Sequence, residues 1–521
     1  MIRRLVHVKK IGWSVMSVLC CLLMSCSQSN KKGLSGQTVL RIGGLQDLEP
    51  LNPILSVLGT ASSLVSVVSD GLVKDFRGEN LLAQSIESAD AKVWKIKIRD
   101  NVYFHDGTLL KARDVLHSFN LVRTKSNRAI HRDHFNLIET IREVTPREIE
   151  VVLSEPCIPF RSYLSFGILP HHLFPLNEFN ETSFLKNPVG TGPFRLVSYQ
   201  GKMVRFERYD RYFQGIPKIS AIEVLQYPTK EEAWMAFVQK HVDIVLDPFT
   251  DTEHLPRFSQ SLIEQKVSPP YGYFLSLSVE SFPLSDLQVR KAISFAINRK
   301  HLLTFAKNLN GPGPEWLLSS TRSKVIPFDV KEAQTILEKA GWKIYPKEVV
   351  RRNGKQRLSF ELRYFSFDEI SWRIARAISR DLFNVGIETR LVPGSIKDIF
   401  SHMNKKKAGA VISFYPPYSD PDRLRDYFHS SMLSEGYNLS HFSDKWVDKL
   451  LMNGRKETDP EQRMGIYQKV LERIQEQAPA IFLFWRHSIV PMDKCWKNVS
   501  ILSGNFLGSV WKWHCIENHE T

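Results

Sequence analysis

The sequence predicts a mixed α/β protein built from several domains. Stretches in which apolar and polar residues alternate, as in half-buried strands, are interleaved with stretches of helical periodicity, and no internal repeat is found. A length of 521 residues suggests roughly three domain-sized units. Hydrophobic residues make up 43% and charged residues 24%, which is ordinary globular usage and excludes wholesale disorder.

The strands are predicted from period-two alternation and from the turn residues beside them. The clearest is 93–98, which continues through 101–104 and meets an Asp-Gly turn at 105–108. A glycine turn at 190–192 leads into another strand rather than into the Lys-bearing helix that a phosphate-binding loop requires. Further strands are predicted at 38–42, 148–153 and 243–245.

The helices are predicted from apolar residues that recur every three to four positions. The helix at 330–340 ends before Gly341, a residue that readily adopts the left-handed conformation needed at a helix C-terminus. The remaining helices are expected at 111–122, 229–241, 289–305, 374–384 and 462–477.

The N-terminus has the pattern of a secretory signal peptide. Four basic residues in the first ten precede the uncharged stretch 11–25, which is shorter than the roughly 20 residues of a membrane-spanning helix. The exit Leu-Met-Ser-Cys resembles the bacterial lipobox, which implies a lipoprotein signal at 1–26 and acylation of Cys26. The alternative is an ordinary signal peptide that is cut elsewhere. No later stretch is long enough to span a membrane, which excludes a polytopic transporter or channel.

The positive charge does not indicate nucleic-acid binding. Loss of residues 1–26, which carry four basic and no acidic side chains, lowers the formal net charge from +15 to +11. The remaining basic residues are scattered among acids, and the densest runs, 351–352 and 405–407, are explained by solvated loops. An exported protein also rarely meets nucleic acid.

Three of the six cysteines remain in the expected mature chain: Cys157, Cys495 and Cys515. The sequence has no Cys-x-x-Cys spacing, so zinc-binding and thioredoxin-like sites lack support. Export permits a disulfide, and Cys495 and Cys515 are the pair closest in sequence. Free, buried cysteines are the alternative.

One segment carries a specific family resemblance. Residues 94–119, WKIKIRDNVYFHDGTLLKARDVLHSF, closely resemble the signature segment of the family 5 extracellular solute-binding proteins. Further blocks follow in the family's order, so that the resemblance extends over about residues 38–490. They are GTGPF at 190–194, YDRYF at 209–213, VDI at 242–244, PLSDLQVRKA at 283–292, the helix 332–342 ending in AGW, and DPD at 420–422.

This resemblance implies a two-lobe periplasmic-binding-protein fold, type II, cluster C, with an extra subdomain in lobe I. By analogy with the family, lobe I comprises 27–270 with the subdomain at about 59–177, and lobe II comprises 271–487. The resemblance also implies two extended crossings between the lobes, one at the strand 271–277 and the other in the apolar run 481–485 or shortly after it. The segment 488–521 returns to lobe I. The family includes oligopeptide-, dipeptide- and nickel-binding lipoproteins of ABC importers, so the resemblance implies a solute held between two lobes that close over it.

The ligand motif departs from the pattern of peptide-binding members. Those proteins usually carry W-x-x-D-Y-P-D-P, whose first aspartate pairs with the ligand's α-ammonium group. Here, alignment on Asp420 places Pro417 at the aspartate position and Phe414 at the tryptophan position. The resemblance therefore implies that the usual anchor for a peptide N-terminus is missing.

Three interpretations of this departure stay open. The ligand is a peptide whose amine is held differently, or it is a modified peptide or another small solute, or the alignment slips and Asp420 or Asp422 binds the amine. Tyr415 and Tyr418 are candidate ligand-contacting aromatics, although packing in the core would also explain them. Arg363 is a candidate for a ligand carboxylate, and a strand-edge arginine at the surface is the alternative.

The sequence therefore predicts a substrate-binding lipoprotein of an ABC importer that delivers peptides or a related small solute to an inner-membrane permease. We expect a monomer that faces the periplasm of a bacterial envelope, with no cofactor, metal or nucleic acid. His105-Asp106 and His171-His172 fit turn and boundary positions better than an acid–base pair or a metal site. The rivals are an envelope lipoprotein with an adhesin or structural role, and a cell-envelope hydrolase, for which the sequence has no Gly-x-Ser-x-Gly or His-Glu-x-x-His motif.

Overall fold

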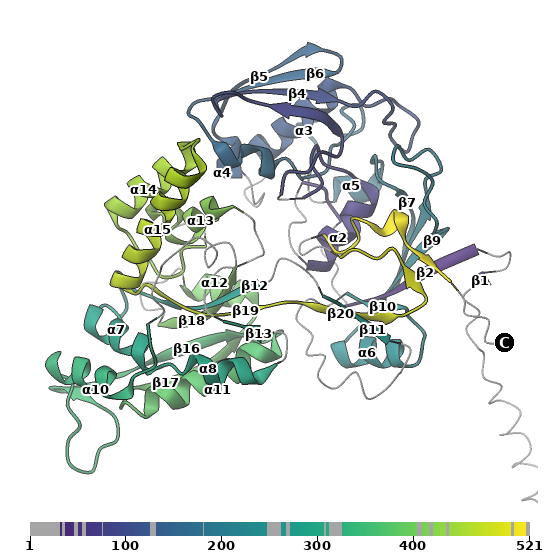
Figure 1. Ribbon diagram of the computed structural model, residues 1–521. Helices are drawn as coiled ribbons and strands as arrows, with labels where there is room; N and C mark the ends of the chain where they lie inside the picture. The colour runs from purple at the N-terminus through teal and green to yellow at the C-terminus, as the bar shows by residue number, and fades with distance from the viewer. Residues whose placement is uncertain are drawn as a thin grey trace, which may run out of the picture.

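The computed structural model arranges the chain as two lobes, each built on its own large sheet, with a smaller sheet above lobe I (Figure 1). The structure describes residues 32–33, 37–45, 51–54, 59–75, 77–125, 132–180, 182–246, 262–266, 271–306, 309–311, 326–403, 409–415, 420–433, 437–501 and 505–516. No helix among these residues is long and apolar enough to cross a membrane.

Lobe I is built on an eight-stranded sheet, and one face of its central strands is fully buried. Leu40 and Ile42 lie beside Ile222 and Val224 in parallel register, and all four side chains are fully buried. Helix α6 (Lys230–Val238) contacts this centre, and its N-terminus is capped by Thr229. The strand order is β11 (Leu262–Lys266), β20 (Ile489–Asp493), β10 (Ile244–Val245), β2 (Gln37–Leu45), β9 (Ala221–Tyr227), β8 (Met203–Arg208) and β7 (Phe194–Gln200), and β1 (Lys32–Gly33) pairs with β2.

A four-stranded antiparallel sheet packs on the same core as the lobe I sheet. It consists of β3 (Ala83–Glu87), β4 (Val93–Ile98), β6 (Glu148–Leu153) and β5 (Ile138–Thr145), in that order. The predicted alternation at 93–98 is confirmed, because every second side chain of β4 is buried. Helix α3 (Ala112–Lys125) contacts β5 and β6 of this sheet, and α4 (Arg132–Phe135) packs on α3, followed in the chain by η1 (Ile158–Tyr163). Helix α2 (Gly59–Val68) contacts β7 of the eight-stranded sheet, and α5 (Ser183–Lys186) precedes β7 in the chain.

Lobe II is built on a six-stranded sheet with helices on both faces. Its central strand β12 (Tyr271–Leu277) is buried along its whole length, which explains its nearly continuous apolar sequence. The order is β13 (Leu309–Asn310), β19 (Ala480–Arg486), β12, β18 (Ala410–Tyr415), β16 (Ser359–Phe365) and β17 (Glu388–Gly394). The helices are α7 (Leu287–Ala296), α8 (Arg299–Leu302), η3 (Leu303–Phe305), α10 (Val330–Lys339), α11 (Glu369–Phe383), α12 (Ile396–Met403), η4 (Pro421–Arg423), α13 (Leu424–Phe428), η5 (Ser430–Met432), α14 (Lys445–Lys456) and α15 (Pro460–Gln477).

Two strand connections link the lobes. Strand β11 pairs with β20 in lobe I, and the strands adjacent in sequence, β12 and β19, pair with each other in lobe II. The chain passes from β19 to β20 with only two residues, His487 and Ser488, between the strands. Figure 1 shows this connection as the yellow strand that runs from one sheet to the other. The lobes are therefore joined by a narrow two-stranded link.

Two predicted elements differ from the structure. The single helix expected at 289–305 is broken, because Ile297 is extended and Asn298 starts α8 as its cap. The backbone N–H of Asn298 donates to Asp381 Oδ2 at 2.9 Å, a contact that the local sequence cannot reveal. The strand expected at 101–104 is reduced to one bridge between Tyr103 and Leu109.

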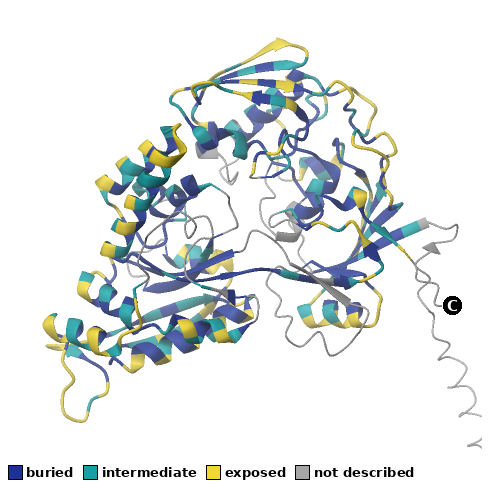
Figure 2. Cartoon of the chain, in the orientation of Figure 1, coloured by how far each residue is buried: buried dark blue, intermediate teal, exposed yellow. Residues whose placement is uncertain are grey.

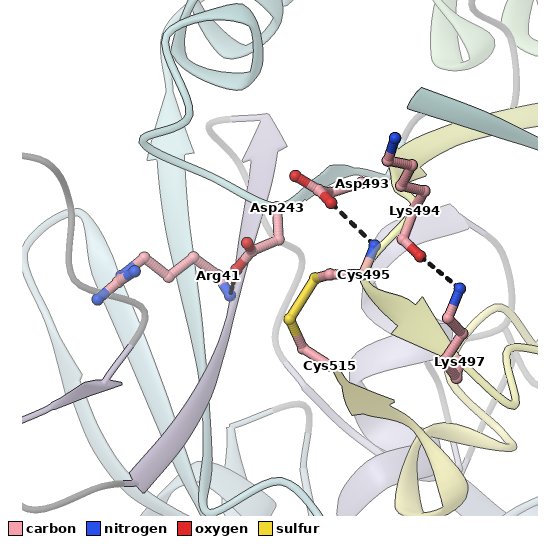
Figure 3. Close-up of a disulfide and its surroundings, with 7 residues drawn as sticks. All are labelled: Arg41, Asp243, Asp493, Lys494, Cys495, Lys497 and Cys515. Atoms are coloured by element: carbon pink, nitrogen blue, oxygen red, sulfur yellow. Dashed lines mark hydrogen bonds between the residues drawn. A yellow bond between two sulfur atoms is a disulfide. The ribbon is translucent and has the colours of Figure 1, made fainter. Parts of the chain in front are cut away.

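The C-terminal segment returns to lobe I and carries a disulfide between Cys495 and Cys515 (Figure 3). The disulfide links Cys495, directly before β21 (Trp496–Lys497), to Cys515 in β22 (His514–Cys515). These two short strands follow β20 in the chain and pair with each other. Asp493 Oδ1 accepts a hydrogen bond from the Cys495 N–H at 2.9 Å. The third cysteine, Cys157, is free and buried.

Candidate functional site

The two lobes meet at a buried polar cluster, which we call the interlobe cluster. It comprises His134 and Tyr163 from the side of the four-stranded sheet and Asp422, Arg455 and Tyr467 from lobe II. The Tyr163 hydroxyl donates to Asp422 Oδ2 at 2.8 Å, across the boundary between the lobes. Arg455 donates to both Asp422 oxygens and, through Nη2, to His134 Nδ1 at 3.2 Å. One carboxylate thus takes donors from both lobes.

Electrostatics hold Asp422 in its charged form inside this cluster. Burial alone would raise the pKa of its carboxyl group, but the charge of Arg455, 2.7 Å away, and its hydrogen bonds bring that pKa below the ordinary value. Tyr467 adds a further donor from lobe II at 3.3 Å. The His134 ring stacks on Tyr163, with centroids 3.6 Å apart. Because the ion pair lies within lobe II, Tyr163 and His134 are the groups that separate from it if the lobes part.

Two further contacts join the lobes. Lys456, at the end of α14, pairs with Glu155 at 2.6 Å beside the interlobe cluster. At the other side, the Lys230 ammonium group at the start of α6 donates to the Phe367 carbonyl oxygen at 2.8 Å. Both contacts involve partly exposed groups, so each adds little energy by itself. Together with the interlobe cluster, they show that η4, α14 and the segment before α11 all contact lobe I.

A second buried ion pair fixes the point at which β19 leaves lobe II. Arg486 Nη1 donates to Asp368 Oδ1 at 2.8 Å and lies 3.2 Å from the Tyr273 hydroxyl. Tyr273 in turn donates to Asp368 Oδ2 at 2.8 Å, and Ser371 donates to the same oxygen. Arg486 is the last residue of β19, so this network anchors the end of the link between the lobes.

Near the same end of the lobe II sheet, two buried side chains have polar atoms without a hydrogen-bond partner in the described part of the chain. They are the Tyr415 hydroxyl and Trp485 Nε1. Both residues are register partners of Gly272, so their side chains share one face of the sheet. A Cβ atom on Gly272 would lie 2.2 Å from the Trp485 ring, which shows that the indole lies directly over the glycine. A buried donor without a partner is costly, so these atoms are candidates to contact a bound solute.

The architecture and the sequence match one known family. The family model described as bacterial extracellular solute-binding proteins, family 5 Middle, matches residues 79–433, more than half of the chain. The chain belongs to the family 5 extracellular solute-binding proteins.

Relatives of this family 5 protein align with most of its length. The oligopeptide-binding protein AppA of Bacillus subtilis (strain 168) is 24% identical over 513 residues, which cover 92% of this chain and 94% of the relative. The nickel-binding periplasmic protein of Escherichia coli (strain K12) is 24% identical over 439 residues, with 80% and 81% coverage. These two names show that relatives at the same identity bind different solutes.

Solved structures confirm the predicted two-lobe fold. NikZ from Campylobacter jejuni, in complex with Ni(L-His), superposes with a TM-score of 0.81 at 23% identity, covering 91% of this chain and 99% of that one. AppA from Bacillus subtilis, in complex with a nonapeptide, gives a TM-score of 0.79 at 21% identity, with 92% and 99% coverage.

Several residues singled out from the sequence of this solute-binding protein have defined structural surroundings. Phe414 packs against the rings of Tyr271, Tyr273 and Phe365, and Tyr415 packs against those of Phe274, Tyr427 and Phe482. Pro417 and Tyr418 lie outside the described residues, as does Cys26.

The charged candidates are already engaged within lobe II. Asp420 accepts two hydrogen bonds from Arg463, at 2.7 and 3.0 Å, and caps η4 through the Asp422 N–H. Arg363 pairs with Glu361 at 2.7 Å, and its buried Nε has no partner in the described part of the chain. A solute carboxylate or amine would therefore compete with an existing ion pair at either residue.

The histidines considered from the sequence have structural contacts. His105 Nε2 donates to the Gly192 carbonyl oxygen at 2.9 Å, and its Nδ1 accepts from the Gly190 N–H. Burial lowers the pKa of His105 to about 4, which keeps the ring neutral. His171 and His172 bond to two different carboxylates, Asp114 and Asp106 respectively. Within the described residues no three His, Cys, Asp or Glu side chains form a group that could hold a metal ion.

Sequence reasoning missed Tyr163, Arg455 and Trp485. The DPD block identified the segment that contains Asp422, and the apolar run 481–485 contains Trp485, but neither pattern indicated a partner. Tyr163 lies 259 residues from Asp422 in the sequence. Only an alignment of homologues or a structure reveals such a pair.

Proposed function

We propose that this protein captures a peptide or a related small solute between its two lobes and delivers it to the permease of an ABC importer. The observation that carries the proposal is the charge-assisted hydrogen bond from Tyr163 of one lobe to Asp422 of the other, in a chain that belongs to the family 5 solute-binding proteins. A contact of this kind favours the arrangement in which the lobes touch. Water is then excluded from between them, which strengthens each polar contact to a bound solute.

The solute class follows from the ligand segment and from what the relatives bind. We infer a peptide or peptide-like solute that is not held by an aspartate at its amine, because Pro417 stands at that position. Asp420 and Asp422 support this inference, since both are paired with arginines in the described structure. Tyr415 and Trp485 offer one hydroxyl and one N–H to the neutral polar groups of such a solute.

Two measurements, made one after the other, test the solute class. Mass spectrometry of the solutes that co-purify with the protein identifies a ligand. Titration calorimetry then compares one peptide in free and N-acetylated form. Removing one partner of a buried ion pair weakens binding by about 3–5 kcal/mol, or about two to three orders of magnitude in affinity. We expect acetylation to change affinity by less than about tenfold, well below that loss. A hundredfold loss would show that a carboxylate holds the amine.

We further propose that the protein is a monomeric lipoprotein, acylated at Cys26, that faces the periplasm from a membrane of the cell envelope. The Cys495–Cys515 disulfide supports export, since such bonds persist in oxidising compartments. Fractionation of a Cys26→Ser variant tests the anchor, because this variant should move to the soluble envelope fraction. If it pellets with membranes after a high-salt wash, as the unaltered protein does, the anchor is wrong, because salt removes proteins that are held by charge alone.

The proposed role needs no covalent chemistry. We assign 27–270 and 488–521 to lobe I, with a subdomain at about 59–177, and 271–487 to lobe II, so that the solute lies where the two meet. Binding and release then require only rotation of the lobes about the two-stranded link. The alternatives weighed from the sequence, an adhesin or structural lipoprotein and a hydrolase, gain no support from the relatives.

A further inference from the structure

The segment between α10 and β16 projects from the outer end of lobe II, and Figure 2 shows much of it as exposed (Figures 1 and 2). We call residues 339–357 the lobe II tip. Three large apolar side chains in it are strongly exposed: Ile344 at 50%, Tyr345 at 44% and Val349 at 61%. Apolar side chains gathered on an exposed projection are a common mark of an interaction surface.

The tip is also strongly basic, and its one acid is neutralised internally. It contains seven Lys or Arg residues and a single acid, Glu348, which pairs with Arg352 at 2.9 Å. Arg351 and Arg357 pair with acids outside the tip, Glu338 and Glu388. The four lysines, Lys339, Lys343, Lys347 and Lys355, make no ion pair within the described part of the chain. Their charge is therefore available to an anionic partner.

The tip is a built structure on a fixed base. The buried Arg351 side chain donates to the carbonyl oxygens of Trp342 and Val385, at 2.9 and 2.8 Å. The backbones of Lys343 and Arg352 exchange two hydrogen bonds, and a turn closes when the Glu348 N–H donates to the Tyr345 carbonyl oxygen at 3.0 Å. The segment that carries the exposed apolar and basic side chains is thus held in a defined conformation.

We propose that the lobe II tip binds the anionic surface of a lipid bilayer. Exposed apolar side chains interleaved with unpaired lysines suit the boundary between headgroups and acyl chains, where the lysines meet lipid phosphates. The interaction would add a second contact to the membrane for an exported protein with a net positive charge. It does not depend on which solute the protein binds.

The test uses the purified Cys26→Ser protein and vesicles of either neutral phosphatidylcholine or a mixture with 30% phosphatidylglycerol. Binding should require the anionic lipid and weaken as salt is added. The triple variant Lys343→Gln, Lys347→Gln, Lys355→Gln should bind about 100-fold more weakly, since each lysine near an anionic surface contributes about fivefold. The variant Ile344→Ser, Tyr345→Ser, Val349→Ser should also bind more weakly.

The β7–β8 hairpin provides a matched control. It exposes Tyr199 at 46% and Met203 at 36%, beside Lys202, so the triple variant Tyr199→Ser, Lys202→Gln, Met203→Ser removes both kinds of side chain from another exposed site. This control should keep wild-type vesicle binding. Equal loss in the control, or equal binding of the unaltered protein to neutral and anionic vesicles, would overturn the proposal.

A second measurement distinguishes the membrane from a protein partner. Brominated anionic lipid should quench the fluorescence of the tryptophan introduced by Tyr345→Trp, but not that of the tryptophan introduced by Tyr199→Trp. If the tip variants lose binding to the detergent-solubilised importer while vesicle binding is unchanged, the partner is a protein and the membrane proposal is wrong. Solute affinity should be the same in all these variants, so failure here leaves the proposed transport function untouched.

Discussion

At the scale of single residues, Tyr163 and Tyr467 allow lobe contact to be separated from stability. Both hydroxyls donate to Asp422, but only Tyr163 does so from the other lobe. Tyr163→Phe should weaken solute binding about 10- to 100-fold, because a hydrogen bond to a charged group contributes about 1.5–3 kcal/mol and this bond forms only when the lobes meet.

Tyr467→Phe is the matched control for that prediction. It should lower the thermal unfolding temperature of the protein but leave solute affinity unchanged, since its bond lies within lobe II. Calorimetric titration of both variants with the co-purified solute measures the difference. Equal affinity losses in the two variants would show that Asp422 acts on the fold alone.

Asp70 should make stability depend on pH. Burial raises the pKa of this carboxyl group to about 7, despite hydrogen bonds from Thr191 and Tyr212. The folded protein therefore holds a proton that the unfolded chain loses at about pH 4. The resulting stability is fully present below pH 4, declines as the pH rises towards 7, and is lost above that value.

The expected loss is at most about 4 kcal/mol between those limits. Asp70→Asn should remove most of this decline, because an amide does not titrate. Thermal unfolding of both proteins at pH 4.5 and pH 8 measures the effect. A variant with the same pH dependence as the unaltered protein would show that Asp70 is not the group responsible.

At the scale of elements, two glycines should respond to alanine in opposite ways. Gly192 lies against α2, where an added Cβ atom would sit 2.5 Å from the Val67 carbonyl oxygen. Gly192→Ala should destabilise the protein by about 1–3 kcal/mol, since backbone atoms cannot move aside. Gly465 in α15 has open space around it, so Gly465→Ala should stabilise it by up to about 1 kcal/mol. Denaturant unfolding compares the two, and the same sign for both would contradict the packing described.

Local patterns were enough to predict elements whose residues carry their own signals. Strand β4 alternates because one face meets the core, and α10 begins after its Asp329 cap and ends at Lys339, two residues before Gly341, whose φ is 86°. The break between α7 and α8 could not be predicted, because Asp381 supplies the bond that stabilises it from another helix. The periodicity of apolar residues along a helix carries no information about such a contact.

The candidate site was less predictable than the fold. The DPD block located Asp420 and Asp422, but the arginines that pair with them, Arg463 and Arg455, lie 43 and 33 residues away on α15 and α14. A motif identifies a carboxylate and not the charge that neutralises it. The same reasoning applies to Trp485, whose position over Gly272 depends on the pairing of β12 with β19.

At the scale of the whole molecule, the account depends on two lobes joined by a narrow link. The two connecting strands pair in both sheets, and the described contacts between the lobes come from η4, α14 and the segment before α11. Such an arrangement permits rotation about the link while each sheet keeps its packing. The interlobe cluster then favours the arrangement in which the lobes touch, and a solute between them adds further contacts.

Small-angle X-ray scattering with and without the co-purified solute tests this central claim most directly. The account predicts that saturating solute lowers the radius of gyration of the protein without unfolding either lobe, and that Tyr163→Phe needs more solute to reach the same compact form. Scattering curves that coincide in the presence and absence of a solute that calorimetry proves to be bound would contradict it.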